Sequence, residues 1–252
     1  RHQEQGKHII TTAIEHHAVL ETIDYLVQHF GFEVTIIQPK NQEITAQQIQ
    51  EALRDDTILV STMFANNETG NLLPIAEIGQ ILKQHPAAYH VDAVQAIGKI
   101  PIHPEKLGID FLTASAHKFH GPKGIGFLYA SSMDFDSYLH GGDQEQKKRA
   151  GTENLAAIVS MVAALKEDLE KQEEHFQHVQ NLETAFLSEL EGVRYYLNRG
   201  EDHLPYVLNI GFPEQKNDLL LLRLDLAGIS ISTGSACTAG IVQSSHVLEA
   251  MY

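Results

Sequence analysis

The sequence lacks the features on which membrane proteins and disulfide-bonded secreted proteins depend. Cysteine occurs once among the 252 residues, at Cys237, which excludes an internal disulfide framework and a multi-cysteine metal site. No apolar run approaches the length of a membrane span, and residues 1–7 show no signal-peptide pattern. We therefore expect a cytoplasmic protein without membrane contact.

Basic residues are also scarce. The chain has 18 Lys and Arg against 33 Asp and Glu, a formal net charge of -15, and one basic cluster at residues 147–149. Nucleic acid binding requires a basic face that neutralises phosphates, so we expect no direct nucleic acid contact. The 15 histidines invite a metal interpretation, but the pairs at 16/17 and 117/120 lack the i, i+4 helical spacing with a glutamate of zinc motifs. We expect no bound metal.

The chain alternates between short apolar segments and segments with apolar residues at helical spacing. This pattern predicts an α/β fold with a mostly parallel sheet flanked by helices. The expected helices follow the first strand, cover 45–53 and begin at Pro74. The expected strands are at 7–12, 33–37, 57–64, 89–92 and 124–130, and a further strand begins at Phe111.

A long helical region follows from Leu155 to Leu190, and we expect its apolar stripes to be core. After this region the sequence pattern changes, and it predicts strands at 205–210 and 229–232 with a helix at 218–227 between them. We place a domain boundary near residue 175, which gives a large domain at 1–175 and a partial smaller α+β domain at 176–252.

The candidate site begins with the stretch 111–128, where one apolar strand ends in Ser115, His117 and Lys118 before a turn rich in Gly and Pro. Ligands of open α/β sheets bind beyond the carboxyl ends of the strands, and a desolvated lysine there can form a Schiff base. Lys123, inside the turn, is expected to be a solvated turn residue.

Other polar residues follow neighbouring predicted strands, and each has two interpretations. His16 either caps a helix or faces water, or it lies flat on an aromatic cofactor. Asp92 either caps the next helix or pairs with a protonated ring nitrogen, as in pyridoxal phosphate enzymes. Cys237 lies among small polar residues, which favours an exposed nucleophile over a buried hydrophobe.

Six motifs in order resemble the cysteine desulfurases of the NifS/IscS family, within the class V aminotransferase superfamily. The resemblance extends over nearly the whole chain and implies the large domain of pyridoxal phosphate fold type I with part of its small C-terminal domain. The motifs are Glu15-His16, Asn66-Asn67-Glu68-Thr69-Gly70, His90-Val91-Asp92-Ala93-Val94-Gln95, Ser115-Ala116-His117-Lys118, Arg149-Ala150-Gly151-Thr152-Glu153-Asn154 and Gly234-Ser235-Ala236-Cys237-Thr238.

The resemblance implies how pyridoxal 5'-phosphate would be held. Lys118 would bind it as a Schiff base and later move protons on the substrate adduct. His16 would stack on the ring and Asp92 would pair with the ring nitrogen. Asn67 and Gln95 would reach the ring hydroxyl.

The remaining roles concern the phosphate and the sulfur. Ser115 and His117 would bind the phosphate, with Thr152 contributed by the second subunit of a homodimer. Cys237 would attack the sulfur of the bound L-cysteine, leaving L-alanine and a persulfide, which is a reversible sulfur carrier. Sulfur-acceptor proteins, namely iron–sulfur scaffolds or tRNA-thiolation enzymes, would be the partners.

Two other functions stay open. A related class V enzyme, such as a selenocysteine lyase, a cysteine sulfinate lyase or an aminotransferase, can act without a loop cysteine. A catalytically degenerate homologue would serve only as a dimer or scaffold partner. Retention of Lys118, Asp92, His16 and Cys237 argues against the second.

The chain departs from the family pattern in three places. Family members usually carry an earlier Gly-rich turn that binds the phosphate and a later arginine that binds the substrate carboxylate, and this sequence has a match to neither. Asp143 replaces a common glycine, and lysines at 147 and 148 stand near frequent arginines. We expect a fragment of a longer enzyme, with weak cofactor binding and poor turnover by itself.

Overall fold

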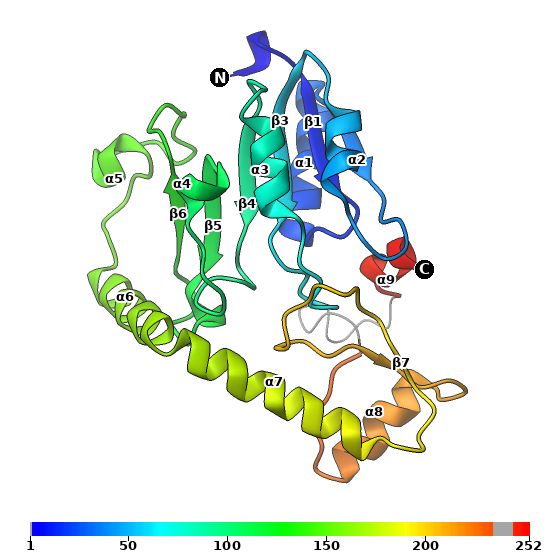
Figure 1. Cartoon of the computed structure of the whole chain (residues 1–252). Coiled ribbons are helices and arrows are strands. Elements are labelled where there is room, and N and C mark those ends of the chain that lie inside the picture. Colours follow the sequence, from blue (N-terminus) through cyan, green and yellow to red (C-terminus); the bar gives the residue numbers. More distant parts are fainter. Residues whose placement is uncertain (1, 234–243) are drawn as a thin grey trace.

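The computed structural model describes residues 2–233 and 244–252, and it places a six-stranded sheet at the centre of the molecule (Figure 1). The strand order is β2-β1-β3-β4-β5-β6, with β6 antiparallel to β5 and the other pairs parallel. The predicted α/β class with a mostly parallel sheet is confirmed. The strands are β1 His8–Thr12, β2 Glu33–Ile37, β3 Thr57–Met63, β4 Ala88–Asp92, β5 Phe111–Ser115 and β6 Gly126–Ala130.

Helices connect the parallel strands. Crossovers between parallel strands are right-handed. The chain moves one way across the sheet from β1 to β2 and the other way from β2 to β3, β4 and β5. The helix α1 therefore lies on one face of the sheet, and the later connecting helices lie on the other. Local signals fix their ends: α1 stops at Gly31 in the left-handed conformation, and Thr45 and Gln48 form a capping box at the start of α2. The connecting helices are α1 His17–Phe30, α2 Ala46–Ala52, α3 Ile75–Leu82 and α4 Pro104–Leu107.

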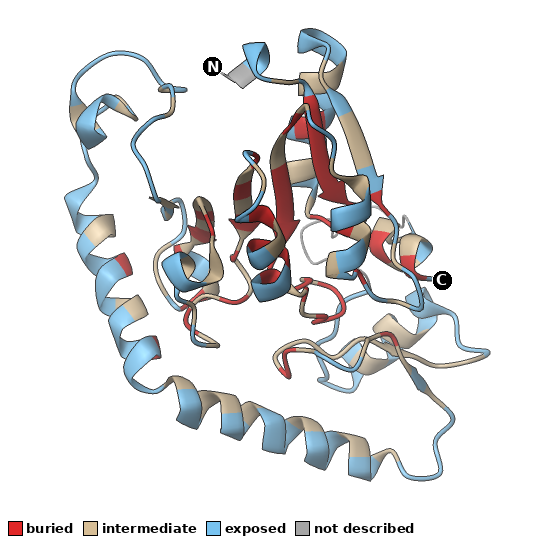
Figure 2. Cartoon of the chain, turned by 45° about the horizontal axis from the view of Figure 1, so that its top comes forward, coloured by how far each residue is buried: buried red, intermediate tan, exposed pale blue. Residues whose placement is uncertain are grey.

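The core lies between the central strands and these helices, where buried residues concentrate (Figure 2). Ile10, Val60 and Val91, from three neighbouring strands, are fully buried, and Ile49 and Ile78 reach them from α2 and α3. Burying such side chains stabilises the fold by about 1.5–3 kcal/mol each.

In the view of Figure 1, the described chain after β6 passes down the left of this unit and then beneath it, and its last residues return to the unit at the right. None of its described helices is long and apolar enough to cross a membrane. A short 3-10 turn, η1 His2–Glu4, precedes β1. The later elements are η2 Ala116–Lys118, α5 Gln144–Lys147, α6 Leu155–Glu170, α7 Gln172–Glu189, β7 Tyr196–Leu197, β8 Ile210–Gly211, α8 Asn217–Leu226 and α9 His246–Met251.

The expectation that the stripes of the long helical region are core is wrong for this chain. The region is interrupted at Lys171, and both helices are largely exposed (Figure 2). Leu155, Val159 and Leu182 keep 70%, 67% and 55% of their surface, because in the described structure α6 packs mainly on η2 and α7. The domain boundary near residue 175 falls inside α7 and stays a prediction.

Two predicted strands of the C-terminal region are also wrong. Residues 205–209 form a turn and loop before the short β8, and 229–232 are irregular. Ile229 and Ile231 are exposed, with no neighbouring strand to accept their backbone hydrogen bonds in the described residues. An apolar run becomes a strand only where another strand pairs with it. The helix predicted at 218–227 is confirmed as α8.

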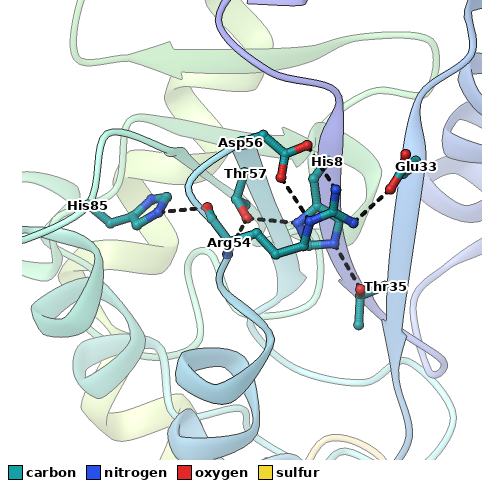
Figure 3. Close-up of polar contacts among 7 residues, drawn as sticks. All are labelled: His8, Glu33, Thr35, Arg54, Asp56, Thr57 and His85. Carbon is teal, nitrogen blue, oxygen red and sulfur yellow. Dashed lines mark hydrogen bonds and ion pairs between the residues drawn. The ribbon is translucent and has the colours of Figure 1, made fainter.

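A buried histidine at the amino end of β1 contacts both neighbouring strands (Figure 3). His8 Nδ1 lies 2.7 Å from Thr57 Oγ1, and His8 Nε2 lies 2.8 Å from Thr35 Oγ1. Arg54 adds exposed ion pairs to Glu33 and Asp56. This network stabilises the sheet at the edge opposite the carboxyl ends of the strands.

Acid is expected to weaken the fold through His8. Burial first, and then the positive charge of Arg54, hold the pKa of His8 below its ordinary value of 6.5. The unfolded chain therefore takes up a proton that the folded chain excludes, and this contribution to stability is lost as the pH falls below 6.5. Urea unfolding from pH 7.5 to 5 should show a smaller pH dependence in His8→Gln than in the wild type. An equal pH dependence of the unfolding free energy in His8→Gln and the wild type would contradict this role of His8. The variant His29→Gln, at an exposed position, is the control.

Candidate active site at the carboxyl edge of the sheet

Four neighbouring strands deliver their following loops to one edge of the sheet. Backbone contacts join the loops in series: Phe64 N donates to Asp92 O at 2.8 Å, and Ala93 N donates to Thr113 O at 2.9 Å. The side chain of Asn66 donates to Ile14 O at 2.9 Å. The loops that carry His16, Asn67, Asp92 and Lys118 are therefore contiguous, in the place where open α/β sheets bind ligands.

The loop after β1 ends in His16, which caps α1. Its Nδ1 accepts a hydrogen bond from Ala18 N at 3.2 Å, so the capping role considered from the sequence is confirmed. An accepting Nδ1 requires the proton on Nε2 in the neutral ring. The Nε2–H of this half-buried imidazole has no partner among the described residues, and capping leaves the ring able to lie on a ligand.

Glu15, beside His16, is a completely buried acid. Its Oε1 accepts from Thr12 Oγ1 at 2.6 Å and from Met63 N at 2.9 Å, whereas Oε2 has no partner in the described structure. Burial, with a smaller contribution from the negative charge of Asp92, raises the pKa of Glu15 to about 8. A neutral carboxylic acid therefore ties the ends of β1 and β3 together beneath the edge.

The loop after β3 is organised by Asn66. Its Oδ1 accepts from Glu68 N at 2.9 Å and from Thr69 N at 3.0 Å, which closes a tight turn. This buried turn leaves the neighbouring Asn67 half-buried on the same loop. The polar segment 66–70 is thus a loop held in one conformation by its own hydrogen bonds, beside the end of β3.

Asp92 ends β4 and caps the turn that follows it, and its pairing with a ring nitrogen stays a prediction. Its Oδ1 accepts from Val94 N at 3.0 Å and so caps the turn that leads to Gln95. The other carboxylate oxygen accepts no hydrogen bond from the described residues. A half-buried carboxylate with one fixed and one open oxygen is a suitable partner for a protonated ring nitrogen.

Lys118 ends the 3-10 turn η2 directly after β5. The turn is fixed by Ala116 N, which donates to Ile125 O at 3.0 Å, and by the fully buried ring of Phe119. Lys118 is half-buried, and its Nζ forms no hydrogen bond with the described residues. Ser115 and the exposed His117 precede it on the same turn, and Lys123 is exposed as predicted.

Gly121 allows this turn to close. A Cβ at position 121 would lie 2.9 Å from Ala116 Cβ and 3.0 Å from Ala116 O. We expect Gly121→Ala to cost about 1–3 kcal/mol of stability and to displace Lys118. A melting temperature equal to that of the wild type would contradict this prediction, and His117→Ala on the same turn, at an exposed position, is the control.

The structure does not bring every predicted residue to this edge. Thr152 is exposed in the loop before α6 and forms no hydrogen bond with the other predicted site residues in the described structure. Cys237 lies outside the described residues. The roles of both stay predictions.

Three residues at or near the edge were missed by the sequence reasoning. Lys99 donates to Gln95, and the buried Asp168 of α6 pairs with His120 at 3.0 Å. His246 of α9 lies 2.9 Å from Glu15 O through its Nε2, and Figure 1 shows α9 beside this end of β1. The i, i+4 spacing of Gln95 and Lys99 is the one local signal that could have found a pair, because the other contacts join distant segments.

Comparison with known proteins agrees with this geometry. The family model described as "Aminotransferase class-V" matches residues 1–251. This chain belongs to the class V aminotransferase family. Within it, the chain is similar to NifS and IscS proteins, and the predicted resemblance is confirmed.

Two curated relatives and two solved structures illustrate the similarity to this class V chain. The IscS 1 protein of Bacillus subtilis (strain 168) is 49% identical over 98% of the chain and 66% of its own length. The protein "Cysteine desulfurase IscS" of Dictyoglomus turgidum is 42% identical over 98% and 64%. The chain thus spans about two thirds of the length of the curated relatives that it matches.

The solved structures agree in fold. A structure titled "NIFS-LIKE PROTEIN" has a TM-score of 0.90 and 36% identity, covering 99% of this chain and 67% of that one. A structure titled "SspA in complex with cysteine" has a TM-score of 0.82 and 35% identity, covering 99% and 70%.

The side chains at the edge match the chemical groups of pyridoxal phosphate, the cofactor that the resemblance implies. Within the described part of the chain, Asp92 offers a carboxylate oxygen without a partner for the ring nitrogen, and Lys118 offers an amine without a partner for the aldehyde. His16 offers a ring face, and Ser115 with His117 offers donors for the phosphate. The chemistry of this set fits the cofactor group by group.

Proposed function

We propose that this chain is the cofactor-binding part of a cysteine desulfurase, which converts L-cysteine to L-alanine and passes the sulfur to Cys237 as a persulfide. The observation that carries the proposal is the half-buried amine of Lys118, which has no hydrogen-bond partner among the described residues and lies next to the strand end that bears Asp92. The names of the similar proteins support the choice of reaction.

Each residue of the site has a role in this proposal that follows from its side-chain chemistry. When bound, pyridoxal phosphate supplies an electrophilic carbon for amines and an electron sink for the substrate's α-carbon. Lys118 provides the amine that anchors it and, once released, a base that moves the α-proton. Asp92 holds the proton on the ring nitrogen. His16 covers the ring face.

Asn67 and Gln95 hold the ring hydroxyl in this proposal, and Ser115 and His117 hold the phosphate. Thr152 completes the phosphate site from the second subunit of a homodimer. Its exposed position, far along the chain from the strand ends, is consistent with a contact to another subunit.

The sulfur step balances without an external oxidant. The Cys237 thiolate attacks the substrate sulfur, forming an S–S bond while the substrate C–S bond breaks. The electron pair of that bond stays on carbon, which takes a proton and leaves as L-alanine. The persulfide then passes its sulfur to an acceptor protein of iron–sulfur cluster assembly or tRNA thiolation.

Visible absorption spectroscopy tests this proposal. The purified protein, mixed with pyridoxal phosphate, should form an absorption band that depends on Lys118 and changes when L-cysteine is added, with L-alanine as the product. Retention of the cofactor without any change on addition of cysteine would support the degenerate homologue. Cysteine turnover that persists at the wild-type rate in Cys237→Ser would support the related lyases.

A further inference from the structure

Lys99 reaches back over one helical turn to Gln95. Lys99 lies in the turn after β4, and its Nζ donates to Gln95 O at 2.9 Å and to Gln95 Oε1 at 3.2 Å. Its ammonium also lies 5.4 Å from the centre of the Tyr206 ring, within the range of a cation–π contact. The side chain is half-buried and therefore held in place by its surroundings.

These contacts decide which end of the Gln95 amide is free. An amide carries an acceptor oxygen and a donor nitrogen, and the two are easily exchanged by rotation. An ammonium has only donors, so the atom that it contacts must be the oxygen. The free end of Gln95 is therefore Nε2, with two N–H donors and no partner among the described residues.

A donor at this position has a chemical preference. It binds an oxyanion better than a hydroxyl, because hydrogen bonds to charged acceptors are about twice as strong as neutral ones. Lys99 adds a positive charge behind the amide, which favours the same anion. Gln95 without Lys99 could rotate and present its oxygen instead, which would favour a neutral hydroxyl.

We propose that Lys99 is a positioning residue that fixes Gln95 as a hydrogen-bond donor to the ring oxygen of pyridoxal phosphate and so favours the ionised form of that oxygen. This inference rests on the proposed function, because it assumes that the ring hydroxyl lies at Gln95. It adds a residue that makes no contact with the cofactor itself.

The groups around Lys99 set the pH range of the effect. Burial, and next the positive charge of Lys118 on η2, lower the pKa of Lys99 to about 8, while Asp168 on α6 opposes the shift. Tyr206 presents its ring from the C-terminal segment. Since the folded pKa lies below the ordinary value of 10.5, the charge is present at pH 7 and is lost as the pH rises through 8.

Calorimetry on the cofactor-free protein tests the inference without enzymatic activity. The probes are 4-deoxypyridoxine 5'-phosphate, which has no aldehyde and so cannot react with Lys118, and its 3-O-methyl ether, which cannot ionise. At pH 7 the wild type should bind the first about tenfold more tightly. Lys99→Met should reduce this ratio to about two, and Lys99→Arg, which keeps the charge and the donors, should restore most of it.

A second readout uses the loaded protein. The pH midpoint of the visible band of bound pyridoxal phosphate should rise by about one unit in Lys99→Met, because the ring oxygen is less readily ionised. Exposed Lys123→Met removes a charge from the adjoining turn and should change neither readout. If Lys99→Met does not stay folded at the assay temperature, the neutral Lys99→Gln is expected to give the same two changes.

The outcomes separate the two proposals. An unchanged probe ratio and midpoint in folded Lys99→Met would overturn the role of Lys99 and leave the proposed function intact. A wild-type protein that binds pyridoxal phosphate but shows no preference between the probes would also overturn it. A wild type that binds neither probe nor pyridoxal phosphate would overturn both.

Discussion

Lys118→Ala is expected to abolish covalent attachment of pyridoxal phosphate and to reduce the conversion of cysteine to alanine by at least about a thousandfold. The half-buried amine is the one lysine nitrogen at the end of β5, and the described residues give it no hydrogen-bond partner that would compete for it. A nucleophile that also moves a proton contributes to two steps, and general acid–base catalysis alone contributes about 10²–10⁴-fold.

Borohydride reduction followed by mass spectrometry measures the attachment directly. Reduction should fix the cofactor to the peptide that contains Lys118 in the wild type and in Lys123→Ala. Lys123 is the matched control because it is an exposed lysine five residues further along the same stretch. A cofactor found on Lys123 or Lys99, or retained after Lys118→Ala, would contradict the assignment.

Glu15 is expected to make the protein less stable as the pH rises from about 5 to 8. The folded pKa of about 8 lies above the ordinary value of 4.5, because burial disfavours the charged form. The folded chain therefore keeps a proton that the unfolded chain releases. The stability from this group is complete below 4.5 and is lost as the pH rises through 8, by up to about 5 kcal/mol at 1.36 kcal/mol per unit.

Glu15→Gln separates charge from shape. The amide keeps an acceptor for Met63 N and Thr12 Oγ1 but cannot ionise, so its stability should change little with pH in this range. Glu15→Ala leaves both donors without their acceptor and should cost about 2–4 kcal/mol at every pH. Urea unfolding from pH 5 to 8 measures all three proteins. Parallel curves for the wild type and Glu15→Gln would show that Glu15 is not held neutral.

Glu15 and His8 are expected to change the free energy of unfolding in opposite directions as the pH rises. His8 weakens the fold below pH 6.5, and Glu15 weakens it as the pH rises towards 8. They lie at opposite edges of the sheet, since His8 begins β1 and Glu15 follows its end. Their variants should therefore change different limbs of the same curve, and nearly independently.

The sequence was sufficient to predict what depends on local pattern. Short apolar runs bounded by polar residues predicted the strands, and the ends of those strands placed His16, Asp92 and Lys118 correctly. The loops that carry these residues lie side by side because parallel neighbouring strands end at one edge, which follows from the predicted fold class.

What the sequence could not supply depends on distant contacts. Nothing in the sequence near Glu15 shows that the N–H of Met63, 48 residues away, donates a hydrogen bond to its buried carboxyl group. The strands expected at 205–210 and 229–232 had suitable residues but mostly no partner strand. The stripes of α6 and α7 predicted burial, and the described chain offers too little surface to cover them.

The measurement that tests the central claim most directly is mass spectrometry of the Cys237 peptide after the protein, loaded with pyridoxal phosphate, has been incubated with L-cysteine and no reductant. The account predicts one added sulfur atom on Cys237, removed by dithiothreitol and accompanied by an equal amount of L-alanine in the first turnover. An unmodified Cys237 peptide together with the formation of alanine, or no alanine from a fully loaded protein, would contradict it.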